Sequence, residues 1–216
     1  MTQLWRDPKL RAVMAASVTL GFAVGVFAIS FGVAAVSAGA SVAQACAMSL
    51  LIFTGASQFS AVSVIASGGS PLAAFGGAAV LAARNGVYGL AMAPHLTGRL
   101  GTRMVAAQIT IDESTAMAAA QGDQVHRRAA FWITGTSVYV FWNLGTLAGA
   151  LLGTSIDPKT YGLDAAVPAA FVAILFPLLR RRVSALAAVT GAVVCVVLIP
   201  LVPVGVPILC ATVGVL

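Results

Sequence analysis

The sequence predicts an all-α, polytopic transmembrane helical bundle of about six to eight membrane segments, some of them broken or half helices, in one domain over residues 1–216. Mean hydropathy is +1.00, and only 8% of the residues are charged. No Asp, Glu, Lys or Arg occurs between Arg11 and Arg84. The apolar runs are continuous rather than alternating, which favours helices over the strands of a membrane barrel.

Three strong apolar runs fill the first half of the chain, at residues 12–36, 42–66 and 71–93. Each is long enough for one crossing, because a hydrocarbon core takes about 20 residues of helix. A basic cluster precedes the first run, as in a signal sequence. A signal sequence has an apolar core of only about 7–15 residues, so we expect residues 12–36 to be retained as a membrane helix.

The second half contains further runs at residues 129–154, 165–179 and 183–202, a weaker one at 104–120 and a short tail at 204–216. The run at 165–179 is short, so we expect it to tilt little or to be shielded by protein. The tail follows Pro200 and Pro203, which end helices. At this length, whether the tail crosses the membrane stays open.

Positive clusters orient the bundle, and they lie at residues 6–11, 127–128 and 180–182. The positive-inside rule places all three, and therefore the N-terminus, in the cytoplasm, with the loop at 155–164 outside. An even number of crossings must then separate the N-terminus from residue 128. We favour a fourth crossing at 104–120; the alternative is that one of the three strong runs dips into the membrane and returns. The aromatic residues near run ends are expected to be interfacial anchors: Trp132, Tyr139, Trp142 and Tyr161.

Two rows of glycine predict close helix packing. Gly145, Gly149 and Gly153 recur every four residues, as do Gly21 and Gly25. Small residues at this spacing let helix backbones approach closely in lipid. The partner helix can belong to this chain or to another subunit.

A polar, glycine-containing segment interrupts the second run. Thr54, Gly55, Ser57 and Gln58 lie near its middle, where unwound backbone and half-helix ends commonly form transporter substrate sites. The alternative is an ordinary helix in which the hydroxyls bond to the backbone and Gly55 serves packing. The amide of Gln58 needs partners at this depth, which favours a substrate site.

Arg84 and Asn85 lie inside the third run, where an ionisable side chain is costly and therefore points to function. A guanidinium matches a carboxylate with two parallel hydrogen bonds, and an amino acid offers such a carboxylate. The alternative is a structural ion pair with one of three acidic residues: Asp112, Glu113 or Asp164.

Three acidic residues are candidates for proton coupling. Asp112 and Glu113 lie at the centre of residues 104–120, so they lie in the membrane if that segment crosses. If it does not cross, Asp112 is a helix N-cap. Asp164 is the third candidate, with interaction with a helix dipole as its alternative role.

Several classes of function are excluded by what the sequence lacks. The basic residues lie in short clusters between apolar runs, so no nucleic-acid partner is expected. Cys46, Cys195 and Cys210 show no metal-ligand spacing, so no metal site is expected. Neither a nucleophile motif nor a phosphate-binding loop with lysine occurs. We therefore expect no enzyme and no cofactor, and any transport to be secondary or driven by another chain.

Five motifs in order resemble the AzlC family, over roughly residues 12 to 180. They are Phe53-Thr54-Gly55-Ala56-Ser57-Gln58-Phe59, Arg84 with Tyr88, Asp112-Glu113-Ser114, Trp142 with Gly145 and Gly149, and Gly162-Leu163-Asp164 followed by Pro168 and Phe171. The resemblance implies the large subunit of a branched-chain amino acid exporter in a bacterial inner membrane, with a small AzlD-type membrane subunit as partner. It implies hydrophobic substrates: valine, leucine, isoleucine or methionine.

The expected function is therefore secondary export of such amino acids, driven by protons. In this hypothesis Arg84 holds the substrate carboxylate, backbone near Gly55 receives the ammonium group, and Asp112 or Glu113 accepts the proton. One alternative is a passive small-solute channel. Another is a structural or assembly subunit whose partner chain carries the transport, which the glycine rows fit equally well.

Overall fold

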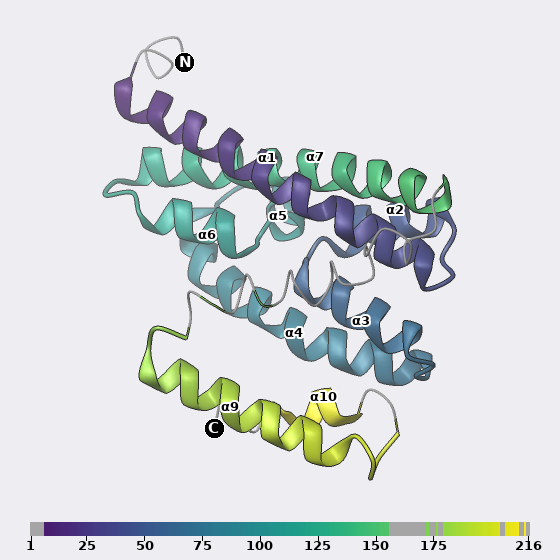
Figure 1. The fold of residues 1–216 in the computed structure, drawn as a ribbon. Helices are drawn as coiled ribbons and strands as arrows, with labels where there is room; N and C mark the ends of the chain where they lie inside the picture. Colours follow the sequence, from purple (N-terminus) through teal and green to yellow (C-terminus); the bar gives the residue numbers. More distant parts are fainter. Residues whose placement is uncertain are drawn as a thin grey trace.

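The computed structural model describes residues 7–155, 172, 176, 179–203, 206–211 and 214, and this part is helical without a strand. Its elements are α1 (Pro8–Ser37), α2 (Val42–Ile52), α3 (Ala56–Ala66), α4 (Pro71–Met92), the 3₁₀ turn η2 (Ala93–His95), α5 (Leu100–Gln108), α6 (Asp112–Ala119), α7 (Gln124–Ser155), α9 (Arg182–Leu198) and α10 (Val206–Cys210) (Figure 1). The all-α prediction is confirmed. Asp164 and most of the expected run at 165–179 lie outside the described residues.

The first expected membrane helix is α1. Its N-cap is Asp7, whose carboxylate accepts a hydrogen bond of 2.8 Å from the backbone N–H of Lys9, and Pro8 follows at the first helical position. The helix has 30 residues, and its most apolar 18-residue window has a mean hydropathy of 2.2. Within the described residues, it alone is both long and apolar enough to cross a membrane, while α2, α3 and α9 are apolar but shorter.

The glycine rows pack α1 against α7 within one chain. A Cβ at Gly145 would collide with the carbonyl oxygen of Gly25, and one at Gly149 with the carbonyl of Ile29. Contacts ascend together along both helices, so α1 and α7 run parallel (Figure 1). Gly21 and Gly153 continue the seam against side chains of the other helix. The prediction of close packing is confirmed, and the structure answers the open question of the partner helix.

The run at 42–66 is not one helix but a helical hairpin. It breaks at residues 53–55, where Gly55 adopts φ +59°, a conformation that favours glycine. The side chain of Gln58 accepts from the Gly55 N–H and donates to the Met48 carbonyl, both at 3.1 Å. In a continuous helix residues 48 and 58 would lie about 15 Å apart along the axis. The bond therefore requires the chain to fold back.

The segment at 104–120 is a second hairpin, so the favoured fourth crossing is wrong. Its arms are α5 and α6, of only nine and eight residues. His95 before α5 and Gln124 after α6 are joined by two hydrogen bonds of 2.8 and 3.0 Å, so the segment starts and ends at one place. The hydroxyl of Ser114 satisfies backbone groups at the break, because it accepts from the Ile111 N–H and donates to the Ile109 carbonyl at 2.8 Å.

With two hairpins in the chain, the number of crossings between the N-terminus and residue 128 is even, as the positive clusters require. The N-terminus of α1 meets that of α7 through a hydrogen bond of 2.9 Å between Asp7 and His126. We call this end of the bundle, with Arg127 and Arg128, the basic end, and the end where α1 and α7 finish the far end. Helix α1 runs to the far end and α4 returns, since its 22 residues extend about 33 Å. The alternative in which a strong run dips in and returns fits α2–α3 (Figure 1).

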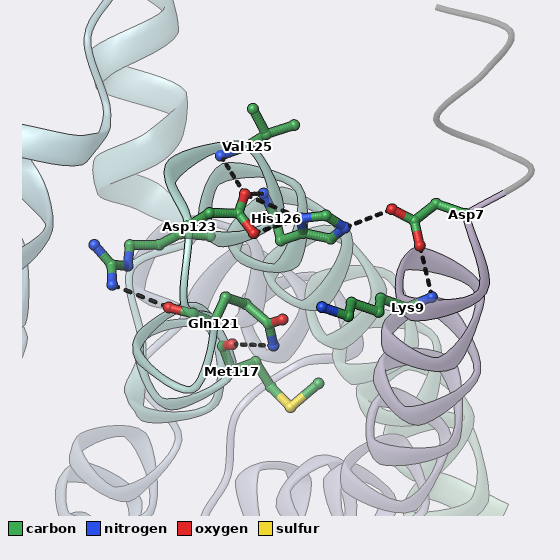
Figure 2. Close-up of polar contacts among 8 residues, drawn as sticks. Asp7, Lys9, Met117, Gln121, Asp123, Val125 and His126 are labelled. Atoms are coloured by element: carbon green, nitrogen blue, oxygen red, sulfur yellow. Dashed lines mark hydrogen bonds and ion pairs between the residues drawn. The ribbon is translucent and has the colours of Figure 1, made fainter.

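His126 joins the first turns of α1 and α7 at the basic end (Figure 2). Its Nε2 lies 2.9 Å from the Asp7 carboxylate, and its Nδ1 lies 2.8 Å from that of Asp123. The hydrogen bonds to Asp123 and then to Asp7 raise the pKa of His126 above its ordinary value of 6.5. The pKa of Asp7 and that of Asp123 are lowered from 3.8, first by backbone N–H groups and then by His126.

This cluster predicts a pH-dependent contribution to stability. Because the pKa of His126 is raised in the folded state, the protonated histidine stabilises the fold fully below pH 6.5, and this stabilisation is lost as the pH rises through the folded-state pKa. The ionised carboxylates of Asp7 and Asp123 contribute above pH 3.8. Replacing His126 with Asn should therefore lower the midpoint of thermal unfolding most between these values and least in alkaline buffer. Unfolding curves of both proteins across pH measure this. An offset that does not vary with pH would contradict it.

Candidate functional site

A cavity of about 300 Å³ lies where the tips of the two hairpins meet. Its lining comes from five parts of the chain: Ala23, Val24 and Phe27 of α1; Phe53, Thr54, Gly55 and Ala56 at the first tip; Arg84 of α4; Ile111, Asp112 and Glu113 at the second tip; and Val138 and Trp142 of α7. The volume is at the small end of the range for ligand pockets, which begins at about 300 Å³. The cavity thus suits a small solute.

Arg84 and Asp112 form an ion pair at this cavity, with 3.1 Å between Nη1 and Oδ2. Their side chains are 38% and 47% exposed, so neither is sealed in the protein. The structural ion pair, one of the two alternatives for Arg84, is therefore present. It does not exclude the other, because a guanidinium carries five N–H donors and the pair engages Nη1. A second carboxylate can bind while the pair persists.

The first hairpin tip divides the predicted substrate residues into two groups. Thr54 and Gly55 line the cavity. Ser57 and Gln58 are buried and are not among the lining residues. The hydroxyl of Ser57 bonds to that of Thr54, and Gln58 closes the turn through its bonds to Gly55 and Met48. The amide of Gln58 has its partners, and they are backbone groups of the hairpin.

Of the other three predicted site residues, one lines the cavity, one does not, and one lies outside the described residues. Glu113 lines the cavity beside Asp112. Asn85 does not line it, and its side-chain oxygen is buried without a hydrogen-bond partner in the described part of the chain. Asp164 lies outside the described residues. The sequence thus identified the charged groups of the cavity, while its proposed role for Asn85 has no geometric support here.

An aromatic wall from α1 and α7 completes the cavity, and sequence reasoning missed it. Trp142 is 3% exposed, and its ring centroid lies 6.1 Å from that of Phe27. Tyr139 packs on Phe53 and donates to the Leu50 carbonyl at 3.0 Å. The interfacial-anchor interpretation is therefore wrong for Trp142 and Tyr139, which contact the first hairpin. The position of Trp142 midway along the run at 129–154 was the available signal.

Backbone conformation, and not lack of space, requires glycine at position 55. A Cβ there would lie 3.6 Å from the ring edge of Trp142, an ordinary contact, but the positive φ disfavours any other residue. The bend thereby brings the C-terminal end of α2 and the N-terminal end of α3 to the cavity, opposite the first turn of α6. The C-terminal end of one helix and the N-terminal ends of two others therefore meet at one small apolar cavity, which also contains three charged side chains.

One comparison with known proteins identifies the family of this chain. The family model described as AzlC protein matches residues 19–156, a stretch that contains both hairpins and every residue lining the cavity. Neither a curated protein nor a solved structure matches the chain. The match covers more than half of the chain and contains four of the five motifs that suggested the family. The chain belongs to the AzlC family, and with its apolar helices this makes it a membrane protein related to transport.

Proposed function

We propose that this chain is a multi-pass secondary transporter subunit that exports branched-chain or other hydrophobic amino acids through the cavity between the hairpins. One observation carries the proposal: a half-exposed Arg84–Asp112 ion pair faces an aromatic wall at two helix breaks. Ionisable groups among apolar helices are costly and mark transport pathways. A zwitterion with an apolar side chain complements both the charged and the apolar part of such a cavity.

The proposed roles follow the chemistry of the lining. The guanidinium of Arg84 holds the substrate carboxylate with paired hydrogen bonds. The C-terminal end of α2 carries a partial negative charge and receives the ammonium group near Gly55. Phe27, Phe53 and Trp142 contact the side chain of the substrate. A cavity of about 300 Å³ admits valine, leucine, isoleucine or methionine.

Asp112 and Glu113 are the proposed proton acceptors. Both line the cavity within reach of the substrate, and protonation of Asp112 would release Arg84 from its ion pair. We expect Asp112→Asn to abolish the dependence of export on a pH gradient, because an amide cannot exchange a proton in this range. Export should be measured in vesicles with and without an imposed gradient. Gradient dependence that stays as large as in the unmodified chain, both in Asp112→Asn and in Glu113→Gln, would contradict the coupling role of both residues.

The proposed setting is a bacterial inner membrane, with the basic end in the cytoplasm and a small AzlD-type subunit as partner. The charge distribution supports this orientation, because Arg127, Arg128 and the start of α1 share one end. The alternative of an assembly subunit makes a different prediction. It requires the partner alone to transport and this chain alone to be inactive.

The decisive experiment measures intracellular valine, leucine and methionine after cells receive a dipeptide load. Cells carry this chain with its proposed small subunit, either chain alone, or neither. Lower accumulation only when this chain is present supports the exporter. Unchanged accumulation of all three amino acids, with both chains verified in the membrane, contradicts it. Export against a concentration gradient separates a transporter from a passive channel.

A further inference from the structure

The two hairpins share one design at their tips. Each break is three residues long, at 53–55 and 109–111, with a threonine at its centre, Thr54 or Thr110. In each, the third residue of the second arm accepts a hydrogen bond from the N–H of the residue that precedes that arm. That residue is Gln58 in one hairpin and Ser114 in the other. Both side chains also bond to a carbonyl group further back in the chain.

The surroundings of the hairpins repeat as well. Each hairpin follows a long helix, α1 or α4, and packs its second arm along the next long helix, α3 on α4 and α6 on α7. The order long helix, first arm, second arm therefore occurs twice in residues 8–119. The first hairpin enters from the far end and the second from the basic end, as the path of α1 and α4 requires (Figure 1). Their tips meet at the cavity.

One side chain joins the two hairpins directly. The amide nitrogen of Gln108, the last residue of α5, donates to the carbonyl of Leu50 at 2.8 Å and to that of Leu51 at 3.3 Å. These carbonyls belong to the last turn of α2, where a helix has no backbone donors of its own to offer. Tyr139 of α7 also donates to the Leu50 carbonyl, and Gln108 supplies from the second hairpin a further hydrogen bond to Leu50 and the one to Leu51.

We propose that the two hairpins are the two gates of an internal inverted repeat and that Gln108 is the positioning residue that fastens the far-end gate to the basic-end gate. The inference rests on the proposed transport function, and it adds which elements move. When the first hairpin separates from Gln108, the carbonyl of Leu51 must find water instead, while that of Leu50 keeps only the hydrogen bond from Tyr139. Separation thus occurs together with entry of water from the far end, while the basic-end gate stays closed.

The test measures access to the cavity and needs no substrate. Ala56→Cys places a reporter thiol on the cavity wall, in a protein whose Cys46, Cys195 and Cys210 are replaced with alanine. A membrane-impermeant maleimide is added from one side at a time, using vesicles of both orientations. Gln108→Leu should raise the labelling rate from the far end about tenfold, since the net value of one or two hydrogen bonds corresponds to such a change. The rate from the basic end should not change.

Gln108→Glu keeps the size of the side chain and makes the test independent of misfolding. The ionised carboxylate cannot donate to a carbonyl, so labelling should be fast at neutral pH. When the carboxyl group introduced at position 108 is protonated in acid, it has one O–H donor again. The labelling rate of Gln108→Glu, divided by that of the reporter protein with Gln108 intact, should therefore fall as the pH is lowered. A side chain with only a packing role would show no such pH dependence.

The matched control is Gln121→Leu. Gln121 also donates its amide to a carbonyl, that of Met117 at 3.1 Å, but this carbonyl lies only four residues back, in the last turns of α6 (Figure 2). This variant should label at the unmodified rate from both sides. Unchanged labelling in Gln108→Leu and in Gln108→Glu, or an equal rise from both ends, would overturn the gate assignment. Because labelling needs no substrate, this failure is distinguishable from loss of export in the amino acid assay.

Discussion

Export of valine, leucine and methionine is expected to fall by about 10- to 100-fold when Arg84 is replaced with alanine. Hydrogen bonds to charged groups contribute about 1.5–3 kcal/mol, and each 1.4 kcal/mol is a factor of ten. Arg84→Lys should restore only part of the loss, because an ammonium group cannot form the planar paired contact. Initial export rates from cells loaded with dipeptide measure the effect. Arg99→Ala, which removes an exposed arginine at the start of α5, serves as the control.

A second variant separates substrate binding from stability. Arg84→Ala leaves Asp112 without its partner at 3.1 Å, so the single variant alone confounds the two roles. The double variant Arg84→Gln with Asp112→Asn removes both charges and leaves no unpaired ion. If Arg84 holds the substrate carboxylate, the double variant should fold normally and export less than Asp112→Asn alone, which controls for loss of the proposed proton acceptor. Normal export by the double variant would show that the pair is structural.

Gly149→Leu is expected to prevent assembly of the bundle. A Cβ at this position would collide with the backbone carbonyl of Ile29, and backbone cannot move aside as a flexible side chain can. Overpacking commonly costs about 1–3 kcal/mol, and contact with backbone puts this site at or above the upper value. The solubilised variant should lose its cooperative thermal transition or unfold at a much lower temperature than the unmodified chain.

Gly101→Leu is the matched control for this substitution. Gly101 lies in α5, and a Cβ there meets no heavy atom within 4 Å. The same added side chain should therefore leave the unfolding midpoint nearly unchanged. A normal transition in Gly149→Leu would mean that α1 and α7 do not pack through their glycine rows.

Composition and periodicity were sufficient for the long helices. The runs at 12–36, 71–93 and 129–154 correspond to α1, α4 and α7. The break near Gly55 was also visible, because glycine and hydroxyl side chains weaken a helix locally. The direction that the chain takes after a break was not visible. It depends on bonds between distant groups, such as Gln58 with Met48 and His95 with Gln124.

The fourth crossing at residues 104–120 was predicted wrongly for the same reason, because the direction of the chain after a break depends on bonds between distant groups. Residues 104–120 and the positive clusters allowed either a crossing or a return, and parity could not distinguish one dipping run from an added crossing. Two hairpins, rather than one, lie between the basic clusters. The first is folded back by the bond from Gln58 to the Met48 carbonyl and the second is closed by the bonds between His95 and Gln124, and no local pattern encodes these bonds.

The sequence by itself determined the helical class, the charged residues Arg84 and Asp112 as candidates for one site, and the glycine rows as a close interface. These follow from residue type, because charge in an apolar run and a missing Cβ have the same physical consequence in any fold. Only the tertiary structure decided that the two hairpins return, that Trp142 and Tyr139 contact the first of them, and that Gln108 joins both. These depend on distances between segments far apart in the chain, and packing and long-range hydrogen bonds set those distances.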